Sequence, residues 1–186
     1  MFSEPALGSC LRISAPAALD ISHFNHAVHR LTFLYVAPRS TTNGSRLSEI
    51  RMTERLTIRT RGQGLHEITR EVQAVVEQGD VVDGLCTIMV QHTSASLTIQ
   101  ENADPSARRD LEAWLNRTVA ENDPLYTHTQ EGPDDMPSHI KAALTSTTLS
   151  IPIIDGRLGL GTWQGIYLWE HRHKGSPRNC LVHVGP

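Results

Sequence analysis

The sequence predicts an α+β fold, a mostly antiparallel, β-sandwich-like sheet with two to three helices. The first observation is the order of periodic segments, which from Met52 onward reads β-α-β-β-α-α-β-β-β. The second is that two connections between consecutive strands are too short for the crossover that parallel neighbours require, so much of the pairing is antiparallel. This order differs from the regular βαβ alternation of a doubly wound sheet.

The first elements follow from apolar periodicity. Residues 55–60 alternate apolar and charged side chains, as in a half-buried strand. In residues 65–79 the apolar side chains recur at helical spacing, and Gly79 suits the C′ position just past a helix end. The β-rich stretch 84–102 opens with an apolar run so continuous that we expect a central strand.

A second helix is predicted within residues 103–119, with Asp104 as its N-cap and Pro105 at its first helical position. Four apolar side chains are expected to face inward: Leu111, Trp114, Leu115 and Val119. A shorter helix with Pro137 near its start comes next. Three strands then complete the chain, at 147–154, 162–172 and 179–185.

The first 51 residues differ from the rest because they show no sustained periodicity and end in a turn-rich polar stretch. We therefore expect residues 1–51 to be a poorly structured N-terminal extension and 52–186 to be the folded domain. A start codon assigned upstream of the native one is one explanation for such an extension.

Composition excludes several classes of function. The net charge of −3 gives no global basic field, so we expect no nucleic-acid partner. No apolar run approaches the roughly 18 residues that span a bilayer, so we expect no membrane segment. The run 31–37 is too short and lacks the basic flank of a signal peptide. Cys86 and Cys180 lie in apolar runs, which predicts buried reduced thiols in a cytoplasmic protein.

Titratable side chains crowd the loop before the short helix. His128, Glu131, Asp134, Asp135 and His139 lie within twelve positions, interrupted by turn-forming residues. Imidazole and carboxylate groups ligate divalent metals or transfer protons near neutral pH. The alternative is a solvated acidic loop in which Asp135 caps the helix. The spacing matches no standard zinc motif.

A second polar cluster follows the apolar run of the central strand. Its members are Gln91, His92, Thr93, Ser94 and Ser96, with Glu101, Asn102 and Asp104 further on. Polar groups at a strand end need partners or a ligand, because burying one unpaired costs roughly 1–3 kcal/mol. The alternative for the histidine is a core residue whose hydrogen bonds are satisfied.

The third feature is the glycine-rich stretch "DGRLGLGTWQGIYLWEHR", residues 155–172. A strand follows its glycines, so it lacks the strand-then-helix context of a dinucleotide-binding fingerprint and is typical of a β-turn. Arg157 beside glycines is suited to hold a phosphate, and Gln164 shares strand parity with Glu170. We expect Trp163 and Trp169 in the core.

Three strings together resemble one family: "QHTSASLTIQENADPSARRD", "YTHTQEGPDDMPSHIKAAL" and "IPIIDGRLGLGTWQGIYLWEHR". They are similar to the YjbQ-like family, also called secondary thiamine-phosphate synthases. The resemblance runs from about Met52 to Val184. It implies a small, single-domain, cytosolic α+β protein that assembles as a homotrimer.

The resemblance also implies an activity, a weak thiamine-phosphate synthase reaction. That transferase joins a hydroxymethylpyrimidine diphosphate to a thiazole phosphate and releases pyrophosphate, which calls for a divalent metal, Mg or Zn, or for cations at the diphosphate. We expect catalytic roles for His92, Glu131 and His139, which we also expect to converge on one pocket. The expected substrate- and phosphate-binding residues are Thr93, Ser94, Asn102, Lys141, Arg157 and Gln164. The candidate metal ligands are His92, Glu101, Asp104, His128 and His139.

Two other classes of function stay open at this point. One is a metal-dependent, hydrolase-like enzyme that acts on another phosphorylated metabolite. The other is a non-catalytic protein that binds a small ligand in the same pocket.

Overall fold

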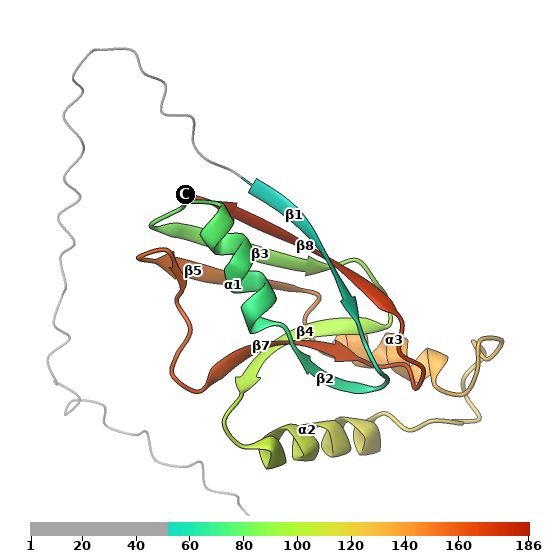
Figure 1. Cartoon of the computed structure of the whole chain (residues 1–186). Helices are drawn as coiled ribbons and strands as arrows, with labels where there is room; N and C mark the ends of the chain where they lie inside the picture. Colours follow the sequence, from blue (N-terminus) through green and yellow to red (C-terminus); the bar gives the residue numbers. More distant parts are fainter. Residues whose placement is uncertain (1–51) are drawn as a thin grey trace, which may run out of the picture. The chain divides into compact units, whose positions relative to one another are not determined.

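The computed structural model describes residues 52–186, which form two antiparallel sheets and three helices (Figure 1). The strands are β1 (Met52–Arg59), β2 (Gly64–Glu67), β3 (Gly84–Val90), β4 (Ala95–Glu101), β5 (Thr148–Ile154), β6 (Arg157–Leu158), β7 (Gln164–Glu170) and β8 (Pro177–Gly185). The helices are α1 (Thr69–Gln78), α2 (Pro105–Thr118) and α3 (Asp135–Leu144). The α+β prediction is confirmed, whereas the expectation for residues 1–51 lies outside the described residues.

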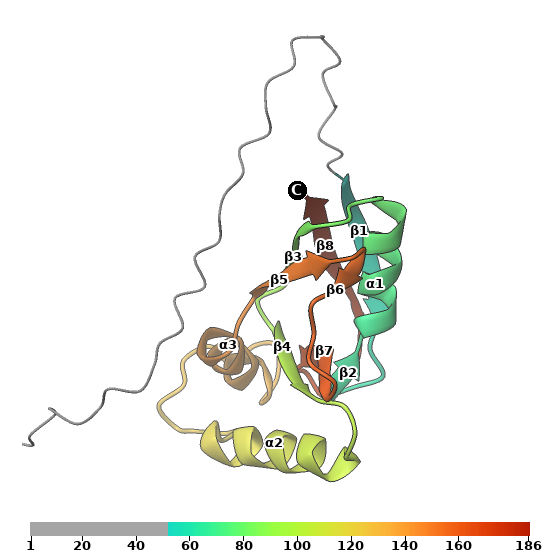
Figure 2. The same cartoon turned by 90° about the vertical axis from the view of Figure 1, so that its left-hand side faces the viewer.

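The two sheets are layered, with helices around the smaller one. The larger sheet has the strand order β1-β8-β3-β5-β6 and the smaller one β2-β7-β4. Every named strand pair is antiparallel. Figure 2 shows α2 running beneath the smaller sheet, with α1 and α3 on opposite sides of it. The segment between β3 and β4 carries the chain from one sheet to the other, and it contains the polar cluster after the central strand.

The main core lies between the sheets and under α1. It contains Val72 and Val75 of α1 and Ile88 of β3. Complete burial of a valine or isoleucine side chain stabilises the folded state by about 1.5–3 kcal/mol. Strand β7 is buried on both faces. On one face Ile166 and Leu168 join this core. On the other face Tyr167 and Trp169 pack in a second cluster that includes Leu115 of α2. One face of β7 therefore packs in the core between the sheets, and the other face packs against α2.

Two short strands were absent from the predicted order. Strand β2 occupies residues that the periodicity assigned to the start of a helix. These residues pair with β7 instead, with Leu65 buried and Gly64 at a φ of +136°. Strand β6 forms a two-residue hairpin with β5 through Asp155 and Gly156, whose φ values of 50° and 72° fit a type I′ turn. The glycine-rich stretch thus begins as a β-turn, as the sequence indicated.

Gly79 does not occupy the predicted C′ position. It is the C-cap of α1 with a right-handed φ of −73°, and Asp80 takes the left-handed conformation with a φ of 49°. A Cβ atom at residue 79 would lie 3.0 Å from Cγ1 of the buried Val184. Close packing of the helix end against β8, not backbone conformation, accounts for this glycine.

The predicted burial of the tryptophans is correct for Trp169 and wrong for two others. Trp114 is 55% exposed and Trp163 is 65% exposed, whereas Trp169 is 6% exposed. Trp114 leaves the predicted inward stripe because α2 covers the small sheet with only a narrow face, centred on Leu115 and Val119. The predicted N-cap is confirmed, since Asp104 accepts a hydrogen bond from the amide of Ser106 at 2.7 Å.

Strand β3 is central, as predicted, but it is covered on one face only. It lies between β8 and β5, yet Leu85 and Met89 on its outer face are about half exposed. Cys86 and Cys180 are buried in the core and unpaired, and burial raises the pKa of each thiol to about 11. Within residues 52–186 no helix is both long and apolar enough to cross a membrane.

Candidate functional site

Three ligand-type side chains meet at the N-terminal end of α3. His128, Asp135 and His139 each offer one atom, and these atoms all lie within 4.8 Å of one another. Nε2 of His128 is 2.8 Å from Oδ2 of Asp135, and Nε2 of His139 is 3.7 Å from the same oxygen. Asp135 and His139 face the same side because they are four residues apart on one helix.

The Oδ2 atom of Asp135 is the unusual member of this group. It is buried, and within the described part of the chain it has no hydrogen-bond partner, because the approach of His128 lacks hydrogen-bond geometry. A buried carboxylate oxygen without a partner costs roughly 1–3 kcal/mol or more. A cation between this oxygen and the two imidazoles would remove that cost.

The orientation of His139 suits a metal ligand. Its Nδ1 lies 3.1 Å from the carbonyl oxygen of Thr93, which can only accept a hydrogen bond. Nδ1 therefore carries the proton of the neutral ring, and Nε2 presents its lone pair towards Asp135. Metal-ligating histidines are commonly fixed by such a bond from the other ring nitrogen.

Arg172 fixes the loop that carries the carboxylates. It forms an ion pair with Oδ1 of Asp135, its Nε donates to Oδ2 of Asp134 at 3.1 Å, and its Nη2 donates to the carbonyl oxygen of Glu131 at 2.7 Å. Burial alone would raise the pKa of Asp134, but hydrogen bonds from the amide of His173 and from Arg172 outweigh it and lower that pKa. The Glu131 side chain stays 70% exposed, with its Oε2 3.7 Å from Nη1 of Arg172.

The donor set fits a transition metal better than magnesium. Two imidazole nitrogens and one carboxylate oxygen match zinc sites with three protein ligands and an open position, whereas magnesium prefers oxygen ligands alone. Ligands on a tetrahedral zinc ion lie roughly 3.4 Å apart, given bonds of about 2.0–2.1 Å. The longest separation between ligand atoms, at most 4.8 Å, would have to shorten by up to about 1.4 Å to reach that spacing, which the half-exposed His128 can provide by a rotamer change.

The His92 ring does not join this group. Its Nε2 accepts a hydrogen bond from the amide of Asn179 at 3.1 Å, and its Nδ1 lies 3.2 Å from Nη1 of Arg178. Burial, and then the positive charge of Arg178, lower the pKa of His92. The structure therefore places His92 at the Arg178 end of strand β8, while the backbone of the next residue, Thr93, meets His139.

Two predicted phosphate-binding residues lie in a buried polar layer. Ser94 is buried, and its carbonyl oxygen accepts a hydrogen bond from the amide of His171 at 3.3 Å. Lys141 is 1% exposed, and its Nζ donates to Oδ1 of Asn116 on α2 at 2.7 Å. Burial lowers the pKa of Lys141. Its amine faces α2, and the residue lies in the last turn of α3, away from the N-terminal end of the helix.

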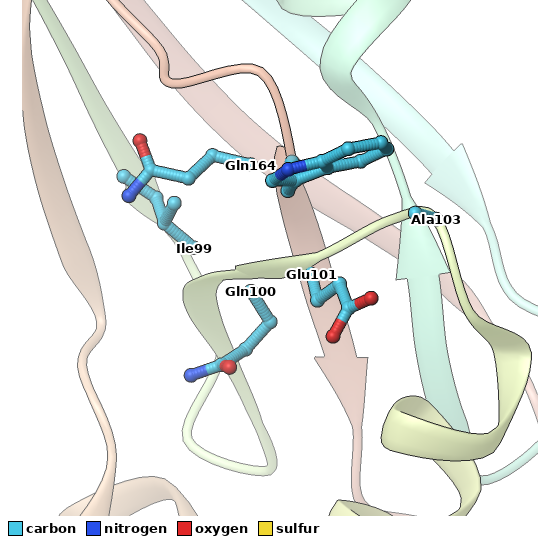
Figure 3. A pocket seen from close by; sticks show the side chains of 6 residues that line it. Ile99, Gln100, Glu101, Ala103 and Gln164 are labelled. Atoms are coloured by element: carbon cyan, nitrogen blue, oxygen red, sulfur yellow. The ribbon is translucent and has the colours of Figure 1, made fainter.

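The remaining predicted residues lie at the opposite end of β4. From Ala95 to Glu101 the strand spans about 20 Å, at about 3.3 Å per residue. Figure 3 shows Glu101 and Gln164 at the hollow of about 460 Å³ formed there with Gln100 and Ala103. Arg157 lines a neighbouring cleft. Asn102 lines a further hollow. Asp104 is engaged as the N-cap of α2.

Comparison with known proteins assigns the fold to a family. The sequence pattern described as "UPF0047 protein YjbQ-like" matches residues 54–185. The chain belongs to this YjbQ-like family. The UPF0047 protein sll1880 of Synechocystis is 53% identical over 131 residues, which cover 70% of this chain and 89% of that protein. The YjbQ protein of Escherichia coli O157:H7 is 47% identical over 128 residues, covering 68% and 92%.

Two solved structures share the architecture. A YjbQ/UPF0047 family protein of Clostridium acetobutylicum has a TM-score of 0.63 at 34% identity and covers 72% of this chain and 98% of its own. The conserved hypothetical protein TT1486 of Thermus thermophilus has a TM-score of 0.64 at 34% identity and covers 70% and 98%. The predicted family is thus confirmed.

Sequence reasoning assigned no ligand or binding role to Asp135, Arg172 or Arg178. Asp135 belonged to the predicted titratable cluster but was not among the candidate metal ligands, although its spacing of four from His139 on a helix was a signal for a shared face. The N-cap of α3 is Asp134. Arg172 follows β7 and Arg178 lies on β8, and no local pattern could have indicated that they reach Asp135 and His92.

Proposed function

We propose that this YjbQ-like protein is a metal-dependent enzyme that acts on phosphorylated small molecules, with its metal centre at His128, Asp135 and His139. One observation carries the proposal: Oδ2 of Asp135 is buried between two imidazole nitrogens and, among residues 52–186, accepts no hydrogen bond. Neither an acidic helix cap nor a solvated loop accounts for that oxygen. The metal we favour is zinc, for the nitrogen donors already described.

The chain's own residues would divide the work of such a centre. A bound divalent cation would supply Lewis-acid stabilisation of negative charge on phosphate oxygens. Asp135 and His139 would hold it from one helix face, while the half-exposed His128 could close over it. The exposed carboxylate of Glu131 lies beside the centre and is placed to accept a proton.

For the reaction, we propose the transferase chemistry that the family resemblance implies. Joining hydroxymethylpyrimidine diphosphate to thiazole phosphate needs stabilisation of the departing pyrophosphate, which a cation provides. A hydrolase-like reaction on another phosphorylated metabolite uses the same centre and is the second candidate. The exposure of the His128 and His139 side chains, 52% and 33%, leaves the centre open to a substrate in either case.

We also propose that the protein is a homotrimer. The resemblance implies this assembly, and the open face of the larger sheet supports an interface. Leu85 and Met89 on β3 and Ile154 on β5 are exposed on this face. Exposed apolar side chains clustered on a sheet face are typical of a buried contact between subunits.

Metal content and turnover together test the proposed function. The purified full chain should contain close to one equivalent of zinc. Thiamine-phosphate formation and hydrolysis of phosphate esters are both assayed, and chelation should abolish the one that the protein catalyses. The Asp135→Asn variant should lose metal and turnover together, whereas His183→Ala, which changes an exposed strand histidine, should keep both. A chelated protein that turns over at the full rate would contradict the proposal.

A further inference from the structure

A second cleft, remote from the metal centre, lies between α1 and the segment that leads from β6 to β7. Its volume is about 560 Å³, within the range of about 300–1,000 Å³ that small-molecule sites occupy. One wall is the exposed face of α1, with Arg70, Gln73 and Glu77. The other wall carries Arg157 and Gln164.

The walls of the cleft are held in place by hydrogen bonds between glutamine side chains and the backbone. The side chain of Gln73 binds the turn and the second strand of the β5–β6 hairpin: its Nε2 donates to the carbonyl oxygen of Gly156 at 3.3 Å, and its Oε1 accepts from the amide of Leu158 at 3.0 Å. Oε1 of Gln164 accepts from the amide of Gly161 at 2.8 Å. A preformed site loses little conformational entropy when a ligand binds.

The cleft also holds two guanidinium groups without acidic partners. Among residues 52–186, no carboxylate lies within 4 Å of the guanidinium nitrogens of Arg70 or Arg157. Arg172 and Arg178, by contrast, are both engaged with carboxylates. Two arginines from separate elements, facing one cleft with Glu77 as its single acidic side chain, favour an anion with several oxygens.

Next to the cleft, Gln164 also lines the hollow shown in Figure 3. Trp163 borders that hollow and is 65% exposed, which is unusual for so large an apolar side chain on a hydrogen-bonded turn. Its exposed ring is a surface on which a planar ring can stack. An amide, Gln100, and a carboxylate, Glu101, lie beside it as hydrogen-bonding groups.

We propose that this cleft is a second ligand site, which binds a small phosphorylated molecule with a planar ring. The phosphate lies between Arg70 and Arg157, and the ring extends past Gln164 onto Trp163. The inference goes beyond the proposed function, since it requires neither a metal nor turnover.

Binding of phenyl phosphate and of inorganic phosphate to the chelated full chain, measured by calorimetry at fixed ionic strength, tests the proposal. The double variant Arg70→Gln/Arg157→Gln should bind both probes about tenfold or more weakly, because it loses two charged donors. Trp163→Ala should weaken phenyl phosphate about threefold and leave inorganic phosphate unchanged. The matched control, Arg61→Gln/Arg117→Gln at two exposed positions outside the cleft, should bind as the native protein does.

Three outcomes would overturn the proposal. In the first, the native chain does not bind phenyl phosphate at millimolar concentration. In the second, the cleft double variant and the control bind equally well. In the third, His139→Ala loses binding, which would place the phosphate at the metal centre. If His139→Ala binds phenyl phosphate normally while the native chain binds no zinc, the proposed function fails and the second site stands.

Discussion

Arg178 of β8 binds Glu170 of β7 through both carboxylate oxygens, and this pair joins the two sheets. The distances are 2.7 Å from Nε to Oε2 and 2.5 Å from Nη2 to Oε1. Glu170 is fully buried and also accepts hydrogen bonds from the hydroxyl of Thr60 and the amide of Arg172. Burial alone would raise the pKa of Glu170, but the bonds from Arg178 and the other donors outweigh it and lower that pKa.

Removing one partner of this pair should destabilise the fold severely. In Arg178→Leu the carboxylate of Glu170 stays buried without its counter-ion, which typically costs about 3–5 kcal/mol. Urea unfolding measures the free energy. Arg61→Leu, at an exposed position after β1, is the control and should stay within about 0.5 kcal/mol of the native value. A loss below about 1 kcal/mol for Arg178→Leu would show that the pair is dispensable.

Acid should destabilise the protein through His171. Burial, and then the charge of Lys141, lower the pKa of this ring from 6.5 to about 3. The unfolded chain therefore binds a proton below about pH 6.5 that the folded chain excludes until about pH 3, so stability falls as the pH falls across this window. One such proton corresponds to about 1.4 kcal/mol per pH unit.

The His171→Gln variant should remove this contribution. The amide can keep the hydrogen bond that the ring forms with the Ser96 hydroxyl at 2.9 Å, but it does not titrate. Unfolding free energies between pH 6 and pH 4 should fall less steeply than in the native chain, by about one proton's worth of slope. The exposed His183→Gln variant is the control. Identical slopes for His171→Gln and the native chain would refute the assignment.

Local patterns reached most of the fold but only part of the site. Periodicity and capping chemistry sufficed for α2, where Asp104 and Pro105 begin the helix as expected. They failed for β2, because four residues carry too little pattern to separate a strand from a helix start. The site depends on contacts over long sequence distances, such as that of Arg172 with Asp134, 38 residues away, which no spacing rule encodes.

The open face of the larger sheet should determine the oligomeric state. Light scattering should give a mass near three chains of 20.6 kDa for the native protein. The double variant Leu85→Lys/Met89→Lys places two charges on that face and should give a monomer, because burying an unpaired charge is costly. Leu125→Lys, at a position that is 84% exposed, should leave the mass unchanged. A monomeric native chain at micromolar concentration would exclude the trimer.

His139 should matter for metal affinity more than for folding. The residue is half-buried and joins the fold through one side-chain hydrogen bond, to the carbonyl oxygen of Thr93. His139→Ala should therefore change the metal-free melting temperature by only a few degrees. It removes one of the three ligand atoms of the proposed centre, so zinc affinity measured by calorimetry should fall about tenfold or more.

A second variant separates ligation from orientation at the same position. In His139→Gln the side chain can still bond to the Thr93 carbonyl but offers zinc a poorer ligand than imidazole, so affinity should fall nearly as far as in the alanine variant. His183→Ala, which also removes one histidine, should bind zinc normally. Unchanged affinity with a large loss of stability would instead make His139 a structural residue. In that case the unpaired oxygen of Asp135 would need another partner, and the N-terminal end of α3 would be an acidic helix start without a metal.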